Sequence, residues 1–217
     1  MINKYPAEAS VCAPQVRTSV KVPLVLSSGE TVSSEIISFT GLSDGKEHFV
    51  VKLGNPASSS PMIRLHSECV TGDVFGSARC DCGPQLREAL ESLHKLGGYL
   101  LYLRQEGRGI GLYRKLEAYR LQDKGYDTYA ANRELGHGDD ERNYSVAADM
   151  LKALDIKRVT LLSNNPDKKA QLIAAGIKVD SQVPTGVFLS ESNRRYLEAK
   201  VAHSNHTINI FKQGELA

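Results

Sequence analysis

The hydrophobic spacing changes partway along this chain, and this change constrains the fold more than any other feature. From about Thr18 to Arg64, apolar residues alternate with polar ones between turn signals such as Ser28-Gly29 and Gly54-Asn55-Pro56. This alternation predicts an antiparallel meander of strands. After Gly83-Pro84, apolar residues recur at the spacing of an amphipathic helix: Leu86, Ala89, Leu90 and Leu93. The chain therefore combines a β-rich entry with a helical continuation.

Strand and helix patterns then alternate to the end of the regular sequence. The ranges Tyr99–Leu103 and Val159–Leu162 predict buried strands. Helices are expected over Leu112–Leu121, Tyr144–Leu154 and Asp167–Ala175, the last one with Asn165 and Pro166 at its start and Gly176 at its end. The sequence predicts an α+β fold rich in α/β units, with βαβ-type units after the strand entry. We expect one domain over residues 18–203, an N-terminal extension over 1–17 and a C-terminal tail over 204–217.

Composition excludes several classes of protein. The 217 residues are 41% hydrophobic and 24% charged, as in ordinary globular domains. The 27 basic and 25 acidic residues give a net charge of 27 − 25 = +2, which disfavours a nucleic-acid partner. The sequence contains no secretory pattern and no apolar run long enough to span a membrane. We therefore expect a cytoplasmic protein without a membrane partner.

Three of the four cysteines lie close together, in the pattern Cys69-x10-Cys80-Asp81-Cys82. Three soft ligands in a short loop favour zinc. With three protein ligands, the fourth position is open to a water molecule, whose pKa zinc lowers from about 15.7 towards about 7. His66, three residues before Cys69, could instead close the site as a structural Cys3His centre. The spacing leaves both alternatives open, together with that of free cysteines.

His66-Ser67-Glu68 also invites comparison with the zinc nucleobase deaminases. Those enzymes combine His-x-Glu with a later Pro-Cys-x-x-Cys motif. Here the second motif is Cys80-Asp81-Cys82, so the match is incomplete.

Two segments are candidates for binding phosphate. In Arg104–Gly111, glycines expose backbone amides and two arginines offer bidentate donors, although a solvated basic turn has the same composition. In Ser163–Lys169, the helix start and Lys168 could hold an anion, or the polar residues could simply cap the helix. A charged loop over residues 136–143 carries Asp140 beside Arg142, although such loops are usually just solvated.

Taken together, these segments resemble GTP cyclohydrolase II. The resemblance covers roughly Pro61 to Pro184, and its motifs occur in the order of the family. The motifs are Arg64–Asp73, Arg79–Gly83, Arg104–Leu112, Leu121–Asp123, Gly125–Thr128, Ala131-Asn132, Asp140–Arg142 and Asn164–Pro166.

The resemblance implies the first step of riboflavin biosynthesis. GTP would lose C8 as formate and its β- and γ-phosphates as pyrophosphate. By the same match, Cys69, Cys80 and Cys82 hold one catalytic zinc ion, and Mg²⁺ accompanies the triphosphate. Asp140 is the expected proton acceptor, Tyr119 assists the chemistry at the ring, and Arg142 is the family's proposed nucleophile. Because arginine has a pKa above about 12, electrostatic stabilisation of phosphate is its more conservative role.

The resemblance also implies a set of GTP contacts and a homodimer. The contacts are Arg64, Leu65, His66, Ser67, Glu68, Gln85, Glu106, Gly107, Arg108, Thr128, Ser163 and Lys168. Ser163 replaces the threonine common in the family but keeps the hydroxyl. The length predicts a monofunctional form, without a fused dihydroxybutanone phosphate synthase domain. The alternatives are a relative that acts on another purine nucleotide and a non-catalytic module that binds zinc or a nucleotide.

Overall fold

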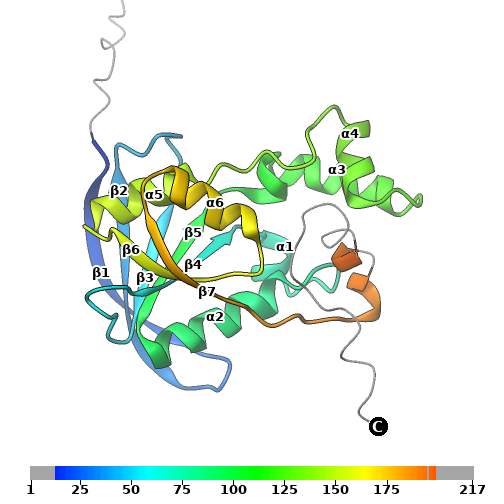
Figure 1. Ribbon diagram of the computed structural model, residues 1–217. Coiled ribbons are helices and arrows are strands. Elements are labelled where there is room, and N and C mark those ends of the chain that lie inside the picture. Colours follow the sequence, from blue (N-terminus) through cyan, green and yellow to red (C-terminus); the bar gives the residue numbers. More distant parts are fainter. Residues whose placement is uncertain (1–12, 195, 199–217) are drawn as a thin grey trace, which may run out of the picture.

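A mixed seven-stranded sheet forms the centre of the protein (Figure 1). The computed structural model describes residues 13–194 and 196–198. The strands lie in the order β1-β2-β3-β5-β4-β6-β7. Their bounds are β1 (Gln15–Val25), β2 (Thr31–Thr40), β3 (Phe49–Leu53), β4 (Met62–Ser67), β5 (Gly98–Leu103), β6 (Arg158–Leu162) and β7 (Lys178–Val183).

One half of the sheet is antiparallel and the other half is parallel. Strands β1, β2, β3 and β5 pair antiparallel, whereas β5, β4, β6 and β7 pair parallel. The predicted meander is therefore right for β1 to β3 and wrong for the segment that ends at Arg64. That segment is β4, which lies beyond β5 rather than beside β3. The helical crossover between β4 and β5 makes these two strands parallel, and β5 takes the position next to β3.

Strand β1 forms one edge of the sheet and is mostly exposed. Its register with β2 shifts between Val16 and Thr18, where the strand has a bulge or irregularity. The strand also carries Lys21 and Pro23, and the side chains of Val16, Val20 and Val25 are exposed.

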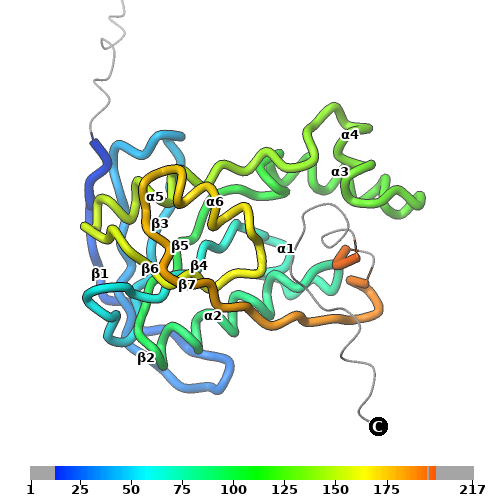
Figure 2. Tube along the Cα trace, viewed as in Figure 1, coloured from blue at the N-terminus to red at the C-terminus, as the bar shows by residue number. Residues whose placement is uncertain are grey.

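Helices cover both faces of the sheet (Figure 2). Helix α2 (Cys82–Leu96) packs Ala89 and Leu93 against Val51, Leu53 and Leu100. Helices α5 (Ser145–Ala153) and α6 (Pro166–Ala174) cover the other face, in a second core that includes Met150, Leu172, Ile63, Leu65 and Leu161. These three helices and the strands β5 and β6 confirm the predicted positions to within a few residues.

The remaining helical segments are grouped beyond one end of the sheet. They are α1 (Val70–Asp73), η1 (Glu106–Gly109), α3 (Leu112–Gln122), α4 (Thr128–Glu134) and η2 (Glu191–Asn193). Figure 1 shows α3 and α4 extending away from the sheet. Asp127 caps α4 by accepting hydrogen bonds from the backbone N–H groups of Tyr129 and Ala130, both at 2.8 Å.

Strands β4 and β6 pair only briefly before they separate. Their register contains Met62 opposite Thr160 and Ile63 opposite Leu161. Beyond these pairs, Arg64 donates to the carbonyl oxygen of Leu162 at 3.1 Å. Lys168 donates to the carbonyl oxygen of Leu65 at 2.8 Å. Arg64 thus connects β4 to β6, and Lys168 connects α6 to β4. Both lie near the edge of the sheet that the carboxyl ends of β4, β5 and β6 share. Ligands of open α/β sheets bind at such an edge.

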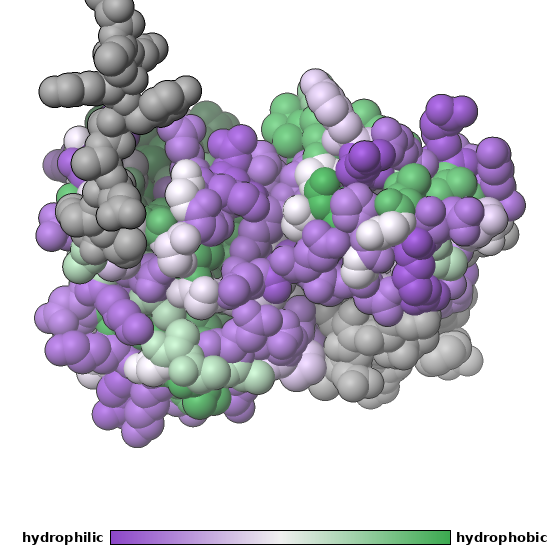
Figure 3. Space-filling model, turned by 90° about the horizontal axis from the view of Figure 1, so that it is seen from above, coloured by the Kyte–Doolittle hydropathy of each residue, from purple (hydrophilic) through white to green (hydrophobic). Residues whose placement is uncertain are grey.

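No helix within the described residues is long and apolar enough to cross a membrane. Seen from above, the molecule shows a mostly hydrophilic face with small apolar patches between the polar side chains (Figure 3). The predicted tail over residues 204–217 and Cys12 lie outside the described residues.

Candidate active site

The three cysteines of the spaced motif converge at the carboxyl end of β4. Cys69 precedes α1, while Cys80 and Cys82 lie on either side of Asp81, the N-cap of α2. Their sulfur atoms all lie within 4.8 Å of one another, and Cys69 Sγ is 3.7 Å from Cys80 Sγ. Tetrahedral zinc with bonds of about 2.3 Å places sulfur atoms about 3.8 Å apart. The spacing of the thiols therefore fits zinc.

Gly72 leaves the space in which the sulfur atoms meet. A Cβ atom at this position would lie 2.8 Å from Cys80 Sγ and 3.1 Å from Cys69 Sγ. Gly83 is equally constrained, since its Cβ would lie 2.3 Å from the carbonyl oxygen of Gly72. Both glycines allow the start of α2 to approach α1 closely, which brings three soft donors around one point, as a thiophilic metal requires.

The thiols share their protons unequally. Hydrogen bonds from Cys80 and Cys82 lower the pKa of the Cys69 thiol. The hydrogen bond between Cys69 and Cys80 raises the pKa of Cys80 to about 11. A hydrogen bond between Cys69 and Cys82 likewise raises the pKa of Cys82. Cys69 Sγ also accepts a hydrogen bond from the ammonium group of Lys115 at 3.1 Å.

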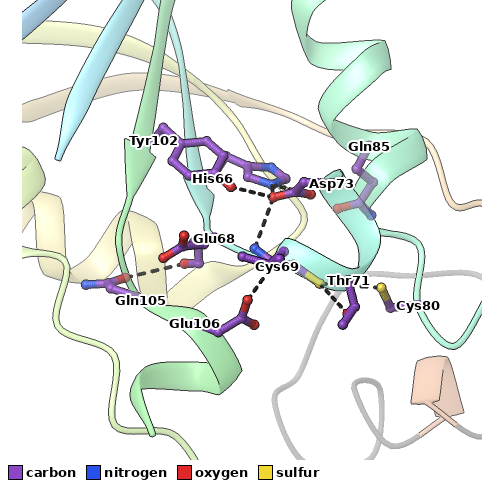
Figure 4. Close-up of polar contacts among 12 residues, drawn as sticks. His66, Glu68, Cys69, Thr71, Asp73, Cys80, Gln85, Tyr102, Gln105 and Glu106 are labelled. Atoms are coloured by element: carbon purple, nitrogen blue, oxygen red, sulfur yellow. Dashed lines mark hydrogen bonds and ion pairs between the residues drawn. The ribbon is translucent and has the colours of Figure 1, made fainter. Parts of the chain in front are cut away.

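His66 does not complete a closed metal centre. Its Nε2 atom lies 3.0 Å from both carboxylate oxygens of Asp73 (Figure 4). Asp73 Oδ2 also accepts from the backbone N–H of Cys69 at 3.0 Å and from Tyr102 at 2.8 Å. Within the described part of the chain, the group that could hold a metal consists of the three cysteines. The Cys3His alternative is therefore wrong, because Asp73 draws the imidazole away from the sulfur atoms.

The cysteines open onto a first cavity, the cysteine cavity. The cavity is lined by the three cysteines, by Arg108 and Arg142, and by six further residues of the predicted site. These six are Ser67, Glu68, Glu106, Gly107, Tyr119 and Thr128. The Tyr119 hydroxyl lies 3.4 Å from Thr71 Oγ1, and Arg79 lies 4.9 Å from the centre of its ring. Burial raises the pKa of Tyr119. The phenol therefore stays protonated and can donate a hydrogen bond within the cavity.

A second cavity, the cationic cavity, adjoins the first. The two cavities share Ser67, Cys82, Arg108, Arg142 and Tyr196. The cationic cavity is also lined by the predicted residues Arg64, His66, Gln85, Ser163 and Lys168. Four cationic side chains, those of Arg64, Arg108, Arg142 and Lys168, thus surround one space.

Several donors in the cationic cavity are buried without a hydrogen-bond partner among the described residues. They are Arg64 Nε, Arg108 Nη1 and Thr185 Oγ1. Arg64 is otherwise held by Leu162 and by Gln85, whose Oε1 accepts at 2.9 Å. Burial lowers the pKa of Arg64. Because buried donors are normally satisfied, the cavity is suited to an anionic ligand that accepts from them.

Asp140 and Arg142 form a bidentate ion pair at the junction of the cavities. Arg142 donates through Nε to Asp140 Oδ1 at 2.8 Å and through Nη2 to Oδ2 at 2.5 Å. Burial opposes the charge of both groups. The pairing with Arg142 nevertheless lowers the pKa of Asp140, and Tyr144 together with Asp140 raises that of Arg142. Arg142 lines both cavities, whereas Asp140 lines neither. The guanidinium group therefore remains charged.

The glycine-rich segment does not present all its amides to a ligand. The Gly107 N–H donates to Glu106 Oε1 at 2.9 Å, and the Gly111 N–H donates to the carbonyl oxygen of Glu106 at 3.0 Å. Gly109 has a φ of 100°, and its Cβ would lie 3.0 Å from the backbone of Glu141. The prediction of a phosphate cradle is therefore wrong for the amides of Gly107 and Gly111. Arg108 alone of this segment faces both cavities.

Other predictions divide between ligand contact and structure. Asn165 accepts from the backbone of Asp167 at 2.8 Å and caps α6, while Ser163 and Lys168 line the cationic cavity. The side chain of Leu65 lies in the hydrophobic core and lines neither cavity. The charged loop packs through Glu141, whose backbone N–H donates to the carbonyl oxygen of Arg108 at 3.0 Å.

Sequence reasoning missed several polar residues of the site. They include Asp73, Gln105, Lys115, Thr185 and Tyr196. Lys115 carried a usable signal, because it lies four residues before Tyr119 on the same helix and therefore on the same face. Asp73 and Gln105 lie inside the recognised motifs without an assigned role, whereas Thr185 and Tyr196 come from segments that approach the site only in the folded chain.

The geometry agrees with comparisons with known proteins. The sequence model of the GTP cyclohydrolase II family matches residues 18–184. This chain belongs to the GTP cyclohydrolase II family. It is 48% identical to the GTP cyclohydrolase-2 of Psychromonas ingrahamii over 198 residues, which cover 90% of this chain and 98% of the relative. It is 46% identical to the GTP cyclohydrolase-2 of Vibrio cholerae over 192 residues, which cover 88% and 97%.

A longer relative contains the same region. The riboflavin biosynthesis protein RibBA of Bacillus velezensis is 49% identical over 178 residues, which cover 81% of this chain and 45% of that protein. The chain is therefore a hydrolase of a family that functions in riboflavin biosynthesis. Family membership confirms the predicted resemblance and the α+β fold, and it decides against a nucleobase deaminase.

Proposed function

We propose that this chain is a zinc-dependent GTP cyclohydrolase II. It hydrolyses GTP to 2,5-diamino-6-(5-phospho-ribosylamino)pyrimidin-4(3H)-one, formate and pyrophosphate, as the first step of riboflavin biosynthesis. One observation carries this proposal: a cluster of three thiols opens onto a cavity that continues into a cationic cavity. The arrangement offers a metal centre for the ring of a nucleotide and a separate place for its phosphates.

Cys69, Cys80 and Cys82 would hold the zinc ion. Bound there, zinc would supply Lewis acidity and lower the pKa of water. The residues around the cluster orient the substrate and move protons. Tyr119, protonated and inside the cysteine cavity, donates a hydrogen bond to the opening ring. Asp140 lines neither cavity and is paired with Arg142, and its assignment as the proton acceptor rests on the family resemblance and on its ionised state.

The cationic cavity binds the triphosphate, accompanied by Mg²⁺. Arg64, Arg108 and Lys168 offer charged donors. Ser163 adds a hydroxyl group, His66 a ring nitrogen and Gln85 a side-chain amide. Arg142, at the junction of the cavities, stabilises negative charge at the α-phosphate. Its raised pKa favours this electrostatic role over the family's proposal of a nucleophilic arginine.

The proposal also includes the assembly and location of the chain. The family resemblance supports a homodimer that acts on a small-molecule substrate, while the near-neutral charge and the lack of a long apolar run support a cytoplasmic protein without a nucleic-acid or membrane partner. Residues 18–203 form its catalytic domain. The predicted contacts of Glu68, Gly107 and Thr128 belong to the cysteine cavity, and that of Leu65 involves its backbone.

The decisive experiment is an assay of the full chain, loaded with zinc, with GTP, Mg²⁺ and a thiol protectant. Mass spectrometry of the nucleotide and assays of formate and pyrophosphate should detect all three products. Cys80→Ser should abolish formate release, whereas the matched control Cys12→Ser should retain it. Undiminished formate from Cys80→Ser would refute the metal centre. If wild-type protein with stoichiometric zinc leaves GTP intact, GTP is not the substrate and other purine nucleotides become the candidates.

A further inference from the structure

Lys115 lies inside the cysteine cavity and is nearly buried. Its side chain retains 11% exposure. The ammonium group donates to Cys69 Sγ at 3.1 Å, to Thr71 Oγ1 at 3.0 Å and to Glu106 Oε1 at 2.7 Å. A lysine ammonium has three N–H donors, and here each has an acceptor. The group is therefore fully used within the protein, although it lines a cavity.

The three acceptors belong to different parts of the site. Cys69 and Thr71 lie at the start of α1 and in it, whereas Glu106 begins η1. Thr71 Oγ1 also contacts the Tyr119 hydroxyl at 3.4 Å. Glu106 Oε2 accepts from the backbone N–H of Val70 at 2.6 Å. Lys115 therefore connects α3 to the segment Cys69–Thr71, both directly and through Glu106.

A structural ion pair with Glu106 would leave the contact with Cys69 unexplained. Glu106 offers a carboxylate, the ordinary partner of a buried ammonium, yet the lysine also reaches a sulfur atom. Three thiolates repel one another, and an adjacent positive charge offsets this repulsion. An N–H···S hydrogen bond also withdraws electron density from the sulfur, which strengthens a bound metal as a Lewis acid.

We propose that Lys115 is a positioning residue of the reaction. Its hydrogen bond holds Cys69 Sγ and places one positive charge beside the three cysteine ligands, and it fixes Tyr119 relative to them through Thr71. The inference rests on the proposed zinc centre and deepens it, because it assigns the charge balance of a site with three anionic ligands to one lysine. Lys115 acts through these groups and is not itself required to touch the substrate.

The test measures metal binding rather than turnover alone. Full-length wild-type protein, Lys115→Met, Lys115→Arg and the exposed control Lys124→Met are titrated with Cd²⁺, and sulfur-to-cadmium charge-transfer absorption is recorded. Zinc affinity is measured by competition with a chromophoric chelator. We expect Lys115→Met to bind zinc about 10 to 100 times more weakly, the usual effect of losing a group that orients metal ligands.

The absorption band gives a signature that a purely structural role would not produce. Without the N–H···S bond, the lone pairs of the sulfur rise in energy, so the band of Lys115→Met should move to longer wavelength. Lys115→Arg, which keeps a charged donor, should restore most of the affinity and the band position. Lys124→Met should match the wild type. In the GTP assay, Lys115→Met should lower kcat while KM changes little, because the cationic cavity is intact.

The outcomes separate this inference from the proposed function. If the wild type binds neither metal through its thiols, the zinc centre fails and this inference fails with it. If the wild type binds both and Lys115→Met has the same affinity and band, the centre stands and the role of Lys115 is refuted. Should Lys115→Met fail to fold, as judged by circular dichroism, Lys115→Gln retains a polar donor without the charge and must show the same direction of change.

Discussion

At the scale of single residues, the space left by Gly72 is as important to the cysteine cluster as the cysteines themselves. Gly72→Ala would place a Cβ atom 2.8 Å from Cys80 Sγ, closer than such atoms approach one another. We expect this variant to bind zinc at least about tenfold more weakly, because the sulfur atoms can no longer converge. Competition with a chromophoric chelator measures the loss.

Gly138→Ala is the matched control, because a Cβ there makes only an ordinary contact of 3.5 Å with Glu141. It should bind zinc as the wild type does. Wild-type affinity in Gly72→Ala would contradict the assigned geometry.

The ion pair of Asp140 and Arg142 predicts a specific dependence on pH. Burial raises the pKa of Asp140, and Arg142 lowers it further than burial raises it. Arg142→Met should therefore raise the pKa of Asp140, because the side-chain hydrogen bonds and charge of Arg142 are lost while the burial remains. Carboxyl ¹³C NMR during an acid titration measures this increase. Arg133→Met removes an exposed pair with Asp139 in the same loop and should leave Asp140 unchanged.

The sign of the effect on stability follows from these directions. In the wild type, the folded pKa lies below the unfolded one, so ionised Asp140 stabilises the fold above the unfolded pKa. This contribution is lost as the pH falls through the folded pKa. In Arg142→Met, the folded pKa of Asp140 is higher than in the wild type, so the ionised group stabilises the fold less at neutral pH. If the free energy of unfolding of Arg142→Met falls at acidic pH in the same way as that of the wild type, the pairing is refuted.

Residue types and spacing were sufficient to predict the kind of site, but they were not sufficient to predict which residues contact one another in it. The pattern of Cys69, Cys80 and Cys82 was sufficient to predict a thiol cluster, because short loops keep nearby residues together. Spacing could not decide the role of His66, since its partner Asp73 became visible only with the fold. Lys115 was missed for a related reason: its three acceptors come from α1 and η1, outside its own helix.

At the scale of secondary-structure elements, the N-cap residue Asp127 is expected to stabilise helix α4. Asp127→Ala removes the acceptor for the N–H groups of Tyr129 and Ala130. We expect a loss of about 1 kcal/mol in the free energy of unfolding, measured by urea denaturation. Asp127→Asn keeps an acceptor and should remain close to the wild type. Equal losses in both variants would show that charge, rather than capping, is what matters.

Long amphipathic helices and buried strands were predictable, whereas strand pairing was not. Helix α2 has a clear apolar stripe and a terminating Gly97 with a φ of 75°. The position of β4 depends on the crossover to β5, which local alternation does not report. Helix α1, with four residues, is too short for a periodic signal. The difference is physical: periodicity records which face is buried, but not against which neighbour.

At the scale of the whole molecule, the cationic cavity links ligand binding to stability. Arg64 connects β4 to β6 and Lys168 connects α6 to β4, and both cations line this cavity together with Arg108 and Arg142. An anion that binds there should stabilise the folded protein. At 100 times its Kd, inorganic pyrophosphate would contribute about 2.7 kcal/mol, and each kcal/mol raises the Tm of a domain of this size by about 2–4 °C.

Differential scanning calorimetry with increasing pyrophosphate measures this shift. Lys168→Met should show a smaller increase at the same concentration, because it lacks one of the charged donors. An equal increase in Lys168→Met would place the anion elsewhere.

The exposed edge strand β1 has a consequence for the behaviour of the chain in concentrated solution. The unpaired backbone groups of an edge strand can form hydrogen bonds with a strand of another chain. The exposed side chains of Val16, Val20 and Val25 would favour such strand addition. The irregular register near Val16, the charge of Lys21 and the missing N–H of Pro23 all oppose it. Strand β1 thus serves as a guard against fibrous aggregation, independently of the chemistry at the opposite half of the sheet.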